Sequence, residues 1–391
     1  MSRSISLTHE GWYYLLVLSF IIGGAILREV NLLVVLSGMM IGPLIFSWRW
    51  VTLTLSNLSI ERRLPSRIAA GDPLVVELAV TNHRRRLTSW AIIATDTIER
   101  EFPHSTERPT RVESAVPGVR AGDMAHASYR CLITRRGRYR FGPIQLATRF
   151  PLGLVTGSER LEAADSLIVC PQQGRLNKRW EQWIDSERAG SQRSNPRRGL
   201  VDGDYYGMRE WRAGDSQRWI HWRTSARLNE LAVRQFEEQK NADVAILLDL
   251  WTPEKPSDGM LGNIEVVVSA GATAVADLCR RGSNMLAVAI HAAETEVCSA
   301  PASATFAQDI LDRLAVAEAT ATDRLQAVLE QLVETSVPGA RLIVFSARKI
   351  DIEARLATLP GNQNARQQAT LARTVWIDVT SDDFASVFTL D

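Results

Sequence analysis

The residues with the clearest chemical potential are arginines and tryptophans that crowd into one segment. Five of the 11 tryptophans lie in a window of about forty residues, 180–222, that is also rich in arginine. Clustered guanidinium groups can bind phosphate or carboxylate groups in bidentate fashion. The segment therefore predicts either an anion-binding site or an internal network of arginine, carboxylate and indole side chains. Because acids and bases nearly balance here, we favour the internal network.

A helix is expected inside this segment. Gly214 and Asp215 are a signal for a turn and a helix start, which predicts a helix over 216–228 with Asp215 as its cap. Arg218 and Trp222 are four residues apart on that helix, so the guanidinium can stack on the indole. The predicted interaction residues are Arg209, Gly214, Asp215, Arg218, Trp222 and Arg227.

The histidine of the segment gives no basis for catalysis. A general base needs an orienting carboxylate and a nucleophile within reach. Asp215, His221 and Ser225 do not together share one helical face in any persuasive way, so we predict no catalytic residue, and nothing in the sequence indicates a cofactor.

Several strings together resemble a known family. The run GDYYGMREWRAGDSQRWIHWRTSAR (203–227) follows RGRYRFGP, PLGL and two apolar spans. This combination resembles the domain of unknown function 58 family of bacterial and archaeal membrane-anchored proteins. The resemblance implies a β-rich domain followed by a von Willebrand factor A-like domain. It also implies association with MoxR-type AAA+ ATPases and often with a transglutaminase-like membrane protein.

The resemblance to von Willebrand factor A domains brings an expectation about metal. Those domains carry a metal-ion-dependent adhesion site with a D-x-S-x-S string after the first strand. Here the aspartate is Asp249, but Trp251 and Pro253 replace both hydroxyl residues. Mg²⁺ requires oxygen ligands in near-octahedral geometry, which these side chains cannot supply. We therefore predict no metal, with Asp249 as a remnant of the site and Trp251 packed in its place.

The C-terminal part alternates between strand and helix patterns. Apolar runs predict strands at 243–250, 285–291, 341–346 and 374–379, and helical patterns lie at 264–281, 306–317, 323–335 and 350–359. This alternation predicts a doubly wound, mainly parallel α/β domain over 241–391, with sites at the carboxyl ends of its strands. The arginine and tryptophan segment, 173–240, precedes it.

Residues 51–172 have a hydrophobic period of two and predict an antiparallel β-sandwich-like domain. Strands are expected at 51–55, 74–80, 90–94, 127–133 and 139–147, and a loop at 102–122. Val76, Leu78 and Val80 are expected to face the core. Arg136, Arg138 and Arg140 alternate onto one solvent face, which either protects a sheet edge or contacts lipid headgroups or an acidic partner.

The first 50 residues predict a two-helix transmembrane hairpin. Uncharged spans lie at about 12–27 and 32–48, and the short link returns the chain to the side it left. Trp12 and Trp48 then lie at one interface, and most flanking arginines lie on that side, against Arg28 on the other. This asymmetry places both termini in the cytoplasm. A cleaved signal peptide is disfavoured, because no small-residue cleavage site follows Leu27.

Composition limits the remaining possibilities. The chain has 391 residues with 46% hydrophobic and 23% charged residues and a net charge of +1, so it is globular with no global attraction to nucleic acid. Its four cysteines are far apart, which predicts neither a disulfide framework nor a zinc site. We expect a bacterial inner-membrane protein whose soluble domains face the cytoplasm. It is expected to act as an adaptor for a MoxR-type AAA+ ATPase in assembly or remodelling at the membrane. The alternative is an enzyme or phosphate-binding module that uses the Arg209–Arg227 cluster.

Overall fold

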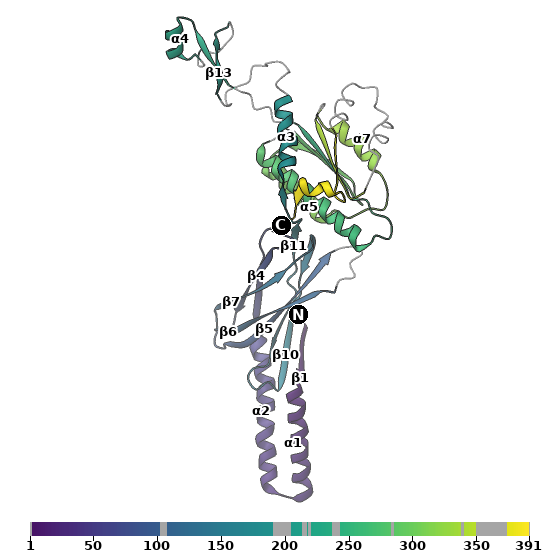
Figure 1. The fold of residues 1–391 in the computed structure, drawn as a ribbon. Helices are drawn as coiled ribbons and strands as arrows, with labels where there is room; N and C mark the ends of the chain where they lie inside the picture. Colours follow the sequence, from purple (N-terminus) through teal and green to yellow (C-terminus); the bar gives the residue numbers. More distant parts are fainter. Residues whose placement is uncertain are drawn as a thin grey trace. The chain divides into compact units, whose positions relative to one another are not determined.

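The chain forms two compact units in a computed structural model, Met1–Gln172 and Gln173–Asp391 (Figure 1). The structure describes residues 2–101, 108–190, 205–212, 217, 220–236, 243–282, 285–337, 340–348 and 374–390.

The first unit opens with a strand and two long apolar helices (Figure 1). Strand β1 (Ser2–Leu7) leads into helix α1 (His9–Arg28), and two residues separate α1 from helix α2 (Asn31–Leu55). The hydroxyl of Thr8 caps α1 by accepting from the backbone N–H of Gly11 at 3.0 Å. The hydroxyl of Tyr14 donates to the carbonyl of Met40 at 2.8 Å and joins the helices. Both helices are long and apolar enough to cross a membrane.

Helix α2 corrects one prediction, because residues 51–55 are its last turns and not a strand. Val51, Thr54 and Leu55 are buried at spacings of three and four residues, which is a helical stripe. A Cβ added at Gly157 would come within 2.3 Å of Val51, so this stripe packs closely on the sheet. Alternating valine, threonine and leucine satisfy both the strand period and the helix period, and packing selects the helix.

Two β-sheets form the body of the first unit. The smaller sheet is antiparallel, in the order β2 (Leu58–Arg63), β4 (Pro73–Asn82), β7 (Met124–Leu132). The larger sheet has the order β1-β10-β9-β5-β8-β11-β3, with β6 also paired to β5. Its other strands are β3 (Ile68–Ala69), β5 (Ser89–Glu101), β6 (Thr110–Val119), β8 (Gly137–Phe141), β9 (Ile144–Thr148), β10 (Val155–Leu161) and β11 (Asp165–Cys170).

One apolar cluster contains side chains from both sheets. Val76, Leu78 and Val80 are fully buried in it, which confirms the predicted core face of β4. Strand β6 lies within the region predicted as a loop, because its glycine and proline masked an alternating pattern in which Ser114 and Val116 are buried. The predicted arginine face is also only partly correct, since Arg138 and Arg140 are exposed but Arg136 is buried.

A buried ion network joins strands of both sheets. The side chain of Arg62 in β2 has no exposed surface and donates to both carboxylate oxygens of Asp96 in β5, at 2.8 and 2.7 Å. It also donates to Asp165 of β11 at 2.6 Å, and Tyr129 of β7 donates to Asp96 at 2.7 Å. Burial would lower the pKa of Arg62, but the two carboxylates raise it overall, so the guanidinium stays charged.

The second unit is built on a five-stranded sheet in the order β17-β16-β15-β18-β19. Its strands are β15 (Val244–Asp249), β16 (Met285–His291), β17 (Glu296–Pro301), β18 (Arg341–Ser346) and β19 (Val375–Asp378). All neighbours are parallel except β17, which pairs with β16 in antiparallel orientation and was not predicted. The predicted strands 285–291 and 341–346 are confirmed with unchanged bounds.

Helices cover both faces of this sheet. Ile246 and Leu248 of β15 pack in one core cluster with helices α5 (Asp258–Arg281) and α6 (Ala304–Val316). Ala245 and Leu247 pack in a second cluster with helix α7 (Leu325–Thr335). The predicted helical patterns at 264–281, 306–317 and 323–335 thus correspond to α5, α6 and α7, and the pattern at 350–359 lies outside the described residues.

Helix α5 is also long and apolar enough to cross a membrane, but its surroundings differ from those of α1 and α2. Its most apolar window is 56% buried inside the structure, against 17% for α1 and 11% for α2. The apolar residues of α5 therefore serve the core of the α/β unit, whereas those of α1 and α2 are left uncovered.

Residues before the predicted α/β boundary contribute to this unit. Helix α3 (Lys178–Gly190) places Trp180, which has no exposed surface, in the core cluster with Phe345. Its indole N–H donates to Asp277 of α5 at 3.0 Å. Strand β12 (Arg175–Leu176) pairs with β20 (Phe388–Thr389), next to the short helix η3 (Asp382–Ser386).

Candidate functional site

Three parallel strands of the second unit end in polar side chains at the same edge. Asp249 is the last residue of β15, and it is in register with His291 at the end of β16 and with Ser346 at the end of β18. All three residues have no exposed surface. The carboxyl edge of a parallel sheet is where binding sites form in doubly wound folds, so this row of side chains is the candidate site.

The carboxylate of Asp249 is fully engaged by donors from the chain itself. His291 Nδ1 lies 2.7 Å from Oδ1, and Ser346 Oγ donates to Oδ2 at 3.0 Å. Arg348, two residues beyond β18, donates from Nε to Oδ2 at 2.8 Å. An ionised carboxylate can only accept, so Nδ1 of His291 carries the proton.

The Arg348 guanidinium is itself held from three directions. Its two terminal nitrogens donate to the two carboxylate oxygens of Asp323, at 2.9 and 3.0 Å. The ring of Trp251 lies against it, with its centroid 4.4 Å from Cζ, and the indole N–H donates to the carbonyl of Ala321 at 3.0 Å. A planar guanidinium can make these contacts at once, whereas a lysine ammonium cannot.

The charges of the site stabilise one another. Burial alone would raise the pKa of Asp249, but the hydrogen bond from His291 and the charge of Arg348 lower it below its usual value. Burial likewise opposes the charge of Arg348, and Asp323 and Asp249 together raise its pKa. The site therefore holds ionised groups of both signs at neutral pH.

His291 connects the site to the loop before α7. Its Nε2 accepts from the backbone N–H of Arg324 at 3.2 Å, and the Thr322 carbonyl lies 3.2 Å away. The same loop pairs with the chain after β15, where the N–H of Thr252 donates to the carbonyl of Thr320 at 2.9 Å. Both ring nitrogens of His291 are thus committed to structure, and neither is free to act as a general base.

These residues do not fit a divalent metal ion. The family resemblance implies hydroxyl ligands at positions 251 and 253, but these residues are Trp251 and Pro253, and both oxygens of Asp249 already accept hydrogen bonds from side chains. Within the described part of the chain there is no group of three histidine, cysteine or acidic residues that could hold a metal. The positive charge next to Asp249 is instead supplied by Arg348.

Part of the arginine and tryptophan segment forms a small module of two strands and one helix. Strands β13 (Tyr205–Glu210) and β14 (Ala232–Phe236) pair in antiparallel orientation, and helix α4 (Trp222–Leu228) lies between them in sequence. Ser225 of α4 accepts from the backbone N–H of Ala232 at 2.9 Å and ties the helix to β14. The imidazole Nδ1 of His221 lies 2.7 Å from the hydroxyl oxygen of Thr224, whereas Ser225 Oγ donates to the backbone carbonyl of His221 at 3.1 Å.

The predicted interaction residues are only partly placed. Arg209 lies in β13 and donates to the carbonyl of Glu210 at 3.0 Å. Trp222 opens α4 with 67% of its surface exposed, and Arg227 lies exposed in its last turn. Gly214, Asp215 and Arg218 lie outside the described residues, and so does the predicted stacking of Arg218 on Trp222.

The comparisons with known proteins point to the same region of the chain. Residues 207–362 match a family model described as "Protein of unknown function DUF58". These residues belong to the DUF58 family. The DUF58 region contains Asp249, His291, Ser346 and Arg348, together with the whole of α4.

One curated relative supports the DUF58 assignment. The chain is 23% identical over 237 residues to "Uncharacterized protein YeaD" of Bacillus subtilis (strain 168). The match covers 60% of this chain and 57% of YeaD, so the chain spans less than two thirds of the length of that relative.

Among solved structures, the chain is similar to the DNA glycosylase AlkC of Pseudomonas fluorescens, at 16% identity and a TM-score of 0.22. That match covers 41% of this chain and 43% of AlkC. It is also similar to a superoxide reductase of Ignicoccus hospitalis, at 15% identity and a TM-score of 0.20, over 28% of this chain and 80% of the reductase. TM-scores this low establish no shared fold for the DUF58 protein.

Proposed function

We propose that this protein is a membrane-anchored adaptor whose DUF58 region binds a protein partner without a metal ion. In this proposal α1 and α2 form a transmembrane hairpin in a bacterial inner membrane, and both units face the cytoplasm. The partner is a MoxR-type AAA+ ATPase, as the family resemblance implies, and a transglutaminase-like membrane protein is a further component.

The anchor is supported by the helices and by the strands on either side of them. Strand β1 precedes α1 and strand β2 follows α2, and both belong to sheets of the first unit. A chain that crosses a bilayer through α1 must therefore return through α2 to reach that unit. Arg3 and Arg49 then lie on the side of the sheets, which is the cytoplasmic side by the positive-inside rule.

The observation that supports partner binding is a set of exposed apolar side chains in the small module of β13, α4 and β14, which lies within the DUF58 region. Trp222 is 67% exposed and Leu228 is 61% exposed, and they are the first and last residues of α4, a helix of 7 residues. Among the residues of the module whose side chains the structure describes, Met208, Trp211 and Leu231 are also exposed. Apolar and aromatic groups left in water are typical of surfaces that bind other proteins.

In the same proposal, the second unit is a von Willebrand factor A-like domain without the metal site, and its topology favours this assignment. Its sheet is parallel except for one edge strand, and helices cover both faces, as a doubly wound fold requires. The ligand edge of that fold is occupied by the Asp249–Arg348 pair. At this edge the Asp249 carboxylate is already engaged by donors from the chain, so binding of a partner would not depend on Mg²⁺.

Affinity purification of the full-length protein from native membranes, with and without ATP, tests the proposal. We expect the ATPase to copurify with the wild type, and we expect Trp222→Ala with Leu228→Ala to lose it while the protein stays in the membrane. Leu261→Ala is the matched control, because Leu261 is a 43% exposed leucine of α5 in the same unit. Equal recovery of the ATPase from all three proteins would refute the assigned surface.

The orientation is tested separately with reporters. A reporter at the C-terminus should behave as cytoplasmic, and one inserted between Arg28 and Asn31 should behave as external. Labelling of engineered cysteines in the α/β unit from outside the membrane would contradict the orientation.

A further inference from the structure

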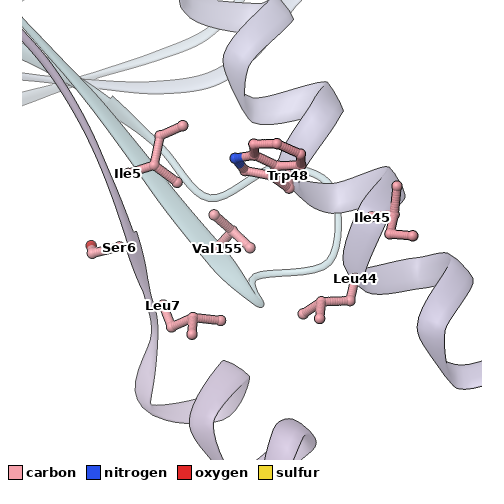
Figure 2. A pocket seen from close by; sticks show the side chains of 7 residues that line it. All are labelled: Ile5, Ser6, Leu7, Leu44, Ile45, Trp48 and Val155. Carbon is pink, nitrogen blue, oxygen red and sulfur yellow. The ribbon is translucent and has the colours of Figure 1, made fainter.

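A pocket lies where the two apolar helices meet the larger sheet. It has a volume of about 300 Å³, which is at the small end of ligand-binding pockets. It is lined by Ile5, Ser6, Leu7, Leu44, Ile45, Trp48 and Val155. Figure 2 shows these side chains arranged between β1, the beginning of β10 and the middle of α2. Six of the seven are apolar or aromatic, so the pocket suits a hydrocarbon ligand.

The position of the pocket along the helices identifies its environment. At 1.5 Å per residue, the 20 residues of α1 span about 30 Å, which is the thickness of a bilayer hydrocarbon core. Helix α2 begins near the C-terminal end of α1, which is the far side of the bilayer from the sheets. Measured from Asn31, Leu44 and Ile45 lie about 20 Å along α2, and Trp48 lies about 26 Å along it. The lower wall of the pocket is therefore at hydrocarbon depth, and Trp48 is at the level where tryptophans meet the headgroups.

The upper wall belongs to strand β1, which continues away from the membrane. Ile5 and Leu7 share one face of β1 with Arg3, because side chains two residues apart point the same way. Arg3 pairs with Glu159 at 3.2 Å and keeps 48% of its side chain exposed. The face thus changes from apolar to charged within two residues, in the order in which a phospholipid changes from acyl chain to headgroup.

We propose that this pocket binds an acyl chain of an anionic phospholipid from the leaflet next to the sheets. The inference rests on the transmembrane hairpin of the proposed function. Leu44 and Ile45 contact the chain within the hydrocarbon layer, and Ile5, Leu7 and Val155 extend the apolar wall above that layer. The Arg3 guanidinium faces the phosphate. The lipid fills the space between β1 and α2 and fixes the first unit at the membrane surface.

Photolabelling of the full-length protein in lipid nanodiscs tests the proposal. The probe is a phosphatidylglycerol with a diazirine on one acyl chain close to the glycerol. After irradiation and trypsin digestion, we expect label on the peptide 150–160, which contains Val155 and no residue of α1 or α2. Ile5→Asp should reduce this label about fivefold or more, because a carboxylate in an apolar pocket is unfavourable for hydrocarbon.

The matched control is Val75→Asp. Val75 is a 43% exposed residue of β4, in the other sheet, and Ile5 is 45% exposed, so both changes place a carboxylate on an exposed strand position. The control should keep the wild-type label on 150–160. Label confined to peptides of α1 and α2, or equal loss in both variants, would overturn the pocket while leaving the anchor intact. Failure of the protein to enter nanodiscs would overturn the anchor as well.

Discussion

The Nε of Arg348 lies 2.8 Å from Oδ2 of Asp249, and both side chains are held in place by further partners. A buried carboxylate stays ionised only where positive charge or hydrogen-bond donors compensate its loss of water. Here the cation is part of the chain, and Trp251 stacks on it. The charge balance of the site is therefore fixed when the protein folds.

Removing the internal cation should destabilise the second unit. Arg348→Ala leaves the buried carboxylate of Asp249 and the partly exposed carboxylate of Asp323 without their shared partner, so we expect the free energy of unfolding to fall by about 3–5 kcal/mol, mostly through Asp249. Arg348→Lys should restore little of this, because an ammonium cannot reach both carboxylates in a planar fork. Thermal or denaturant unfolding of the full chain measures the change.

The control for this prediction is Arg280→Ala. The side chain of Arg280 is 75% exposed and lies 3.7 Å from Asp277, so its loss should change stability by less than about 0.5 kcal/mol. A comparable loss from both variants would show that the Arg348 contacts contribute no more than a surface pair.

Magnesium should not stabilise the wild-type protein. A ligand that binds only the folded state raises the free energy of unfolding by RT ln(1 + [L]/Kd), and the melting temperature rises with it. Because the contacts of Asp249 are satisfied by Arg348, His291 and Ser346, millimolar Mg²⁺ should leave the melting temperature unchanged. A rise that Asp249→Ala abolishes would mean that metal displaces Arg348.

Acid should weaken the site in a defined pH range. The folded pKa of Asp249 is lowered, so its contribution is complete above the unfolded value of about 3.9 and is lost as pH falls through the folded pKa. Stability followed from pH 5 to pH 2 should therefore fall more steeply for the wild type than for Asp249→Asn. Parallel curves for the two proteins would exclude this carboxylate as a source of the acid sensitivity.

The parts of the fold that the sequence predicted well are those with one dominant signal. Strands β16 and β18 are uninterrupted apolar runs buried on both faces, and their predicted bounds are correct. Residues 51–55 fit two periods, and the packing of Val51 on Gly157 chooses the helix. That choice depends on a residue far away in the sequence, so a local pattern could not make it.

The candidate site was predictable only at its centre. The broken metal-binding string singled out Asp249 and the absence of both hydroxyl ligands. His291 lies 42 residues and Arg348 lies 99 residues from Asp249 in the chain, and the parallel register brings them together. A usable signal was nevertheless present, because three buried apolar strands each end in a polar residue, Asp249, His291 and Ser346.

The first unit should also lose stability when the guanidinium of its buried network, that of Arg62, is replaced by an ammonium. Arg62→Lys keeps a charge but cannot donate to both oxygens of Asp96 and to Asp165, so we expect a loss of about 3 kcal/mol or more. Arg63→Lys, on the exposed face of the same strand, should have little effect. Unfolding curves of the two variants compare them, and similar curves would refute a special role for Arg62.

The pairing of the Arg348 guanidinium with the Asp249 carboxylate at the sheet edge is central to the site and to its proposed use. A double-mutant cycle of Asp249→Ala and Arg348→Ala tests it most directly, with the free energy of unfolding measured for all four proteins. We predict a coupling energy of about 1.5 kcal/mol or more, because each single change leaves the other charge buried with an incomplete set of partners. Additive effects, with a coupling energy below about 0.5 kcal/mol, would contradict it.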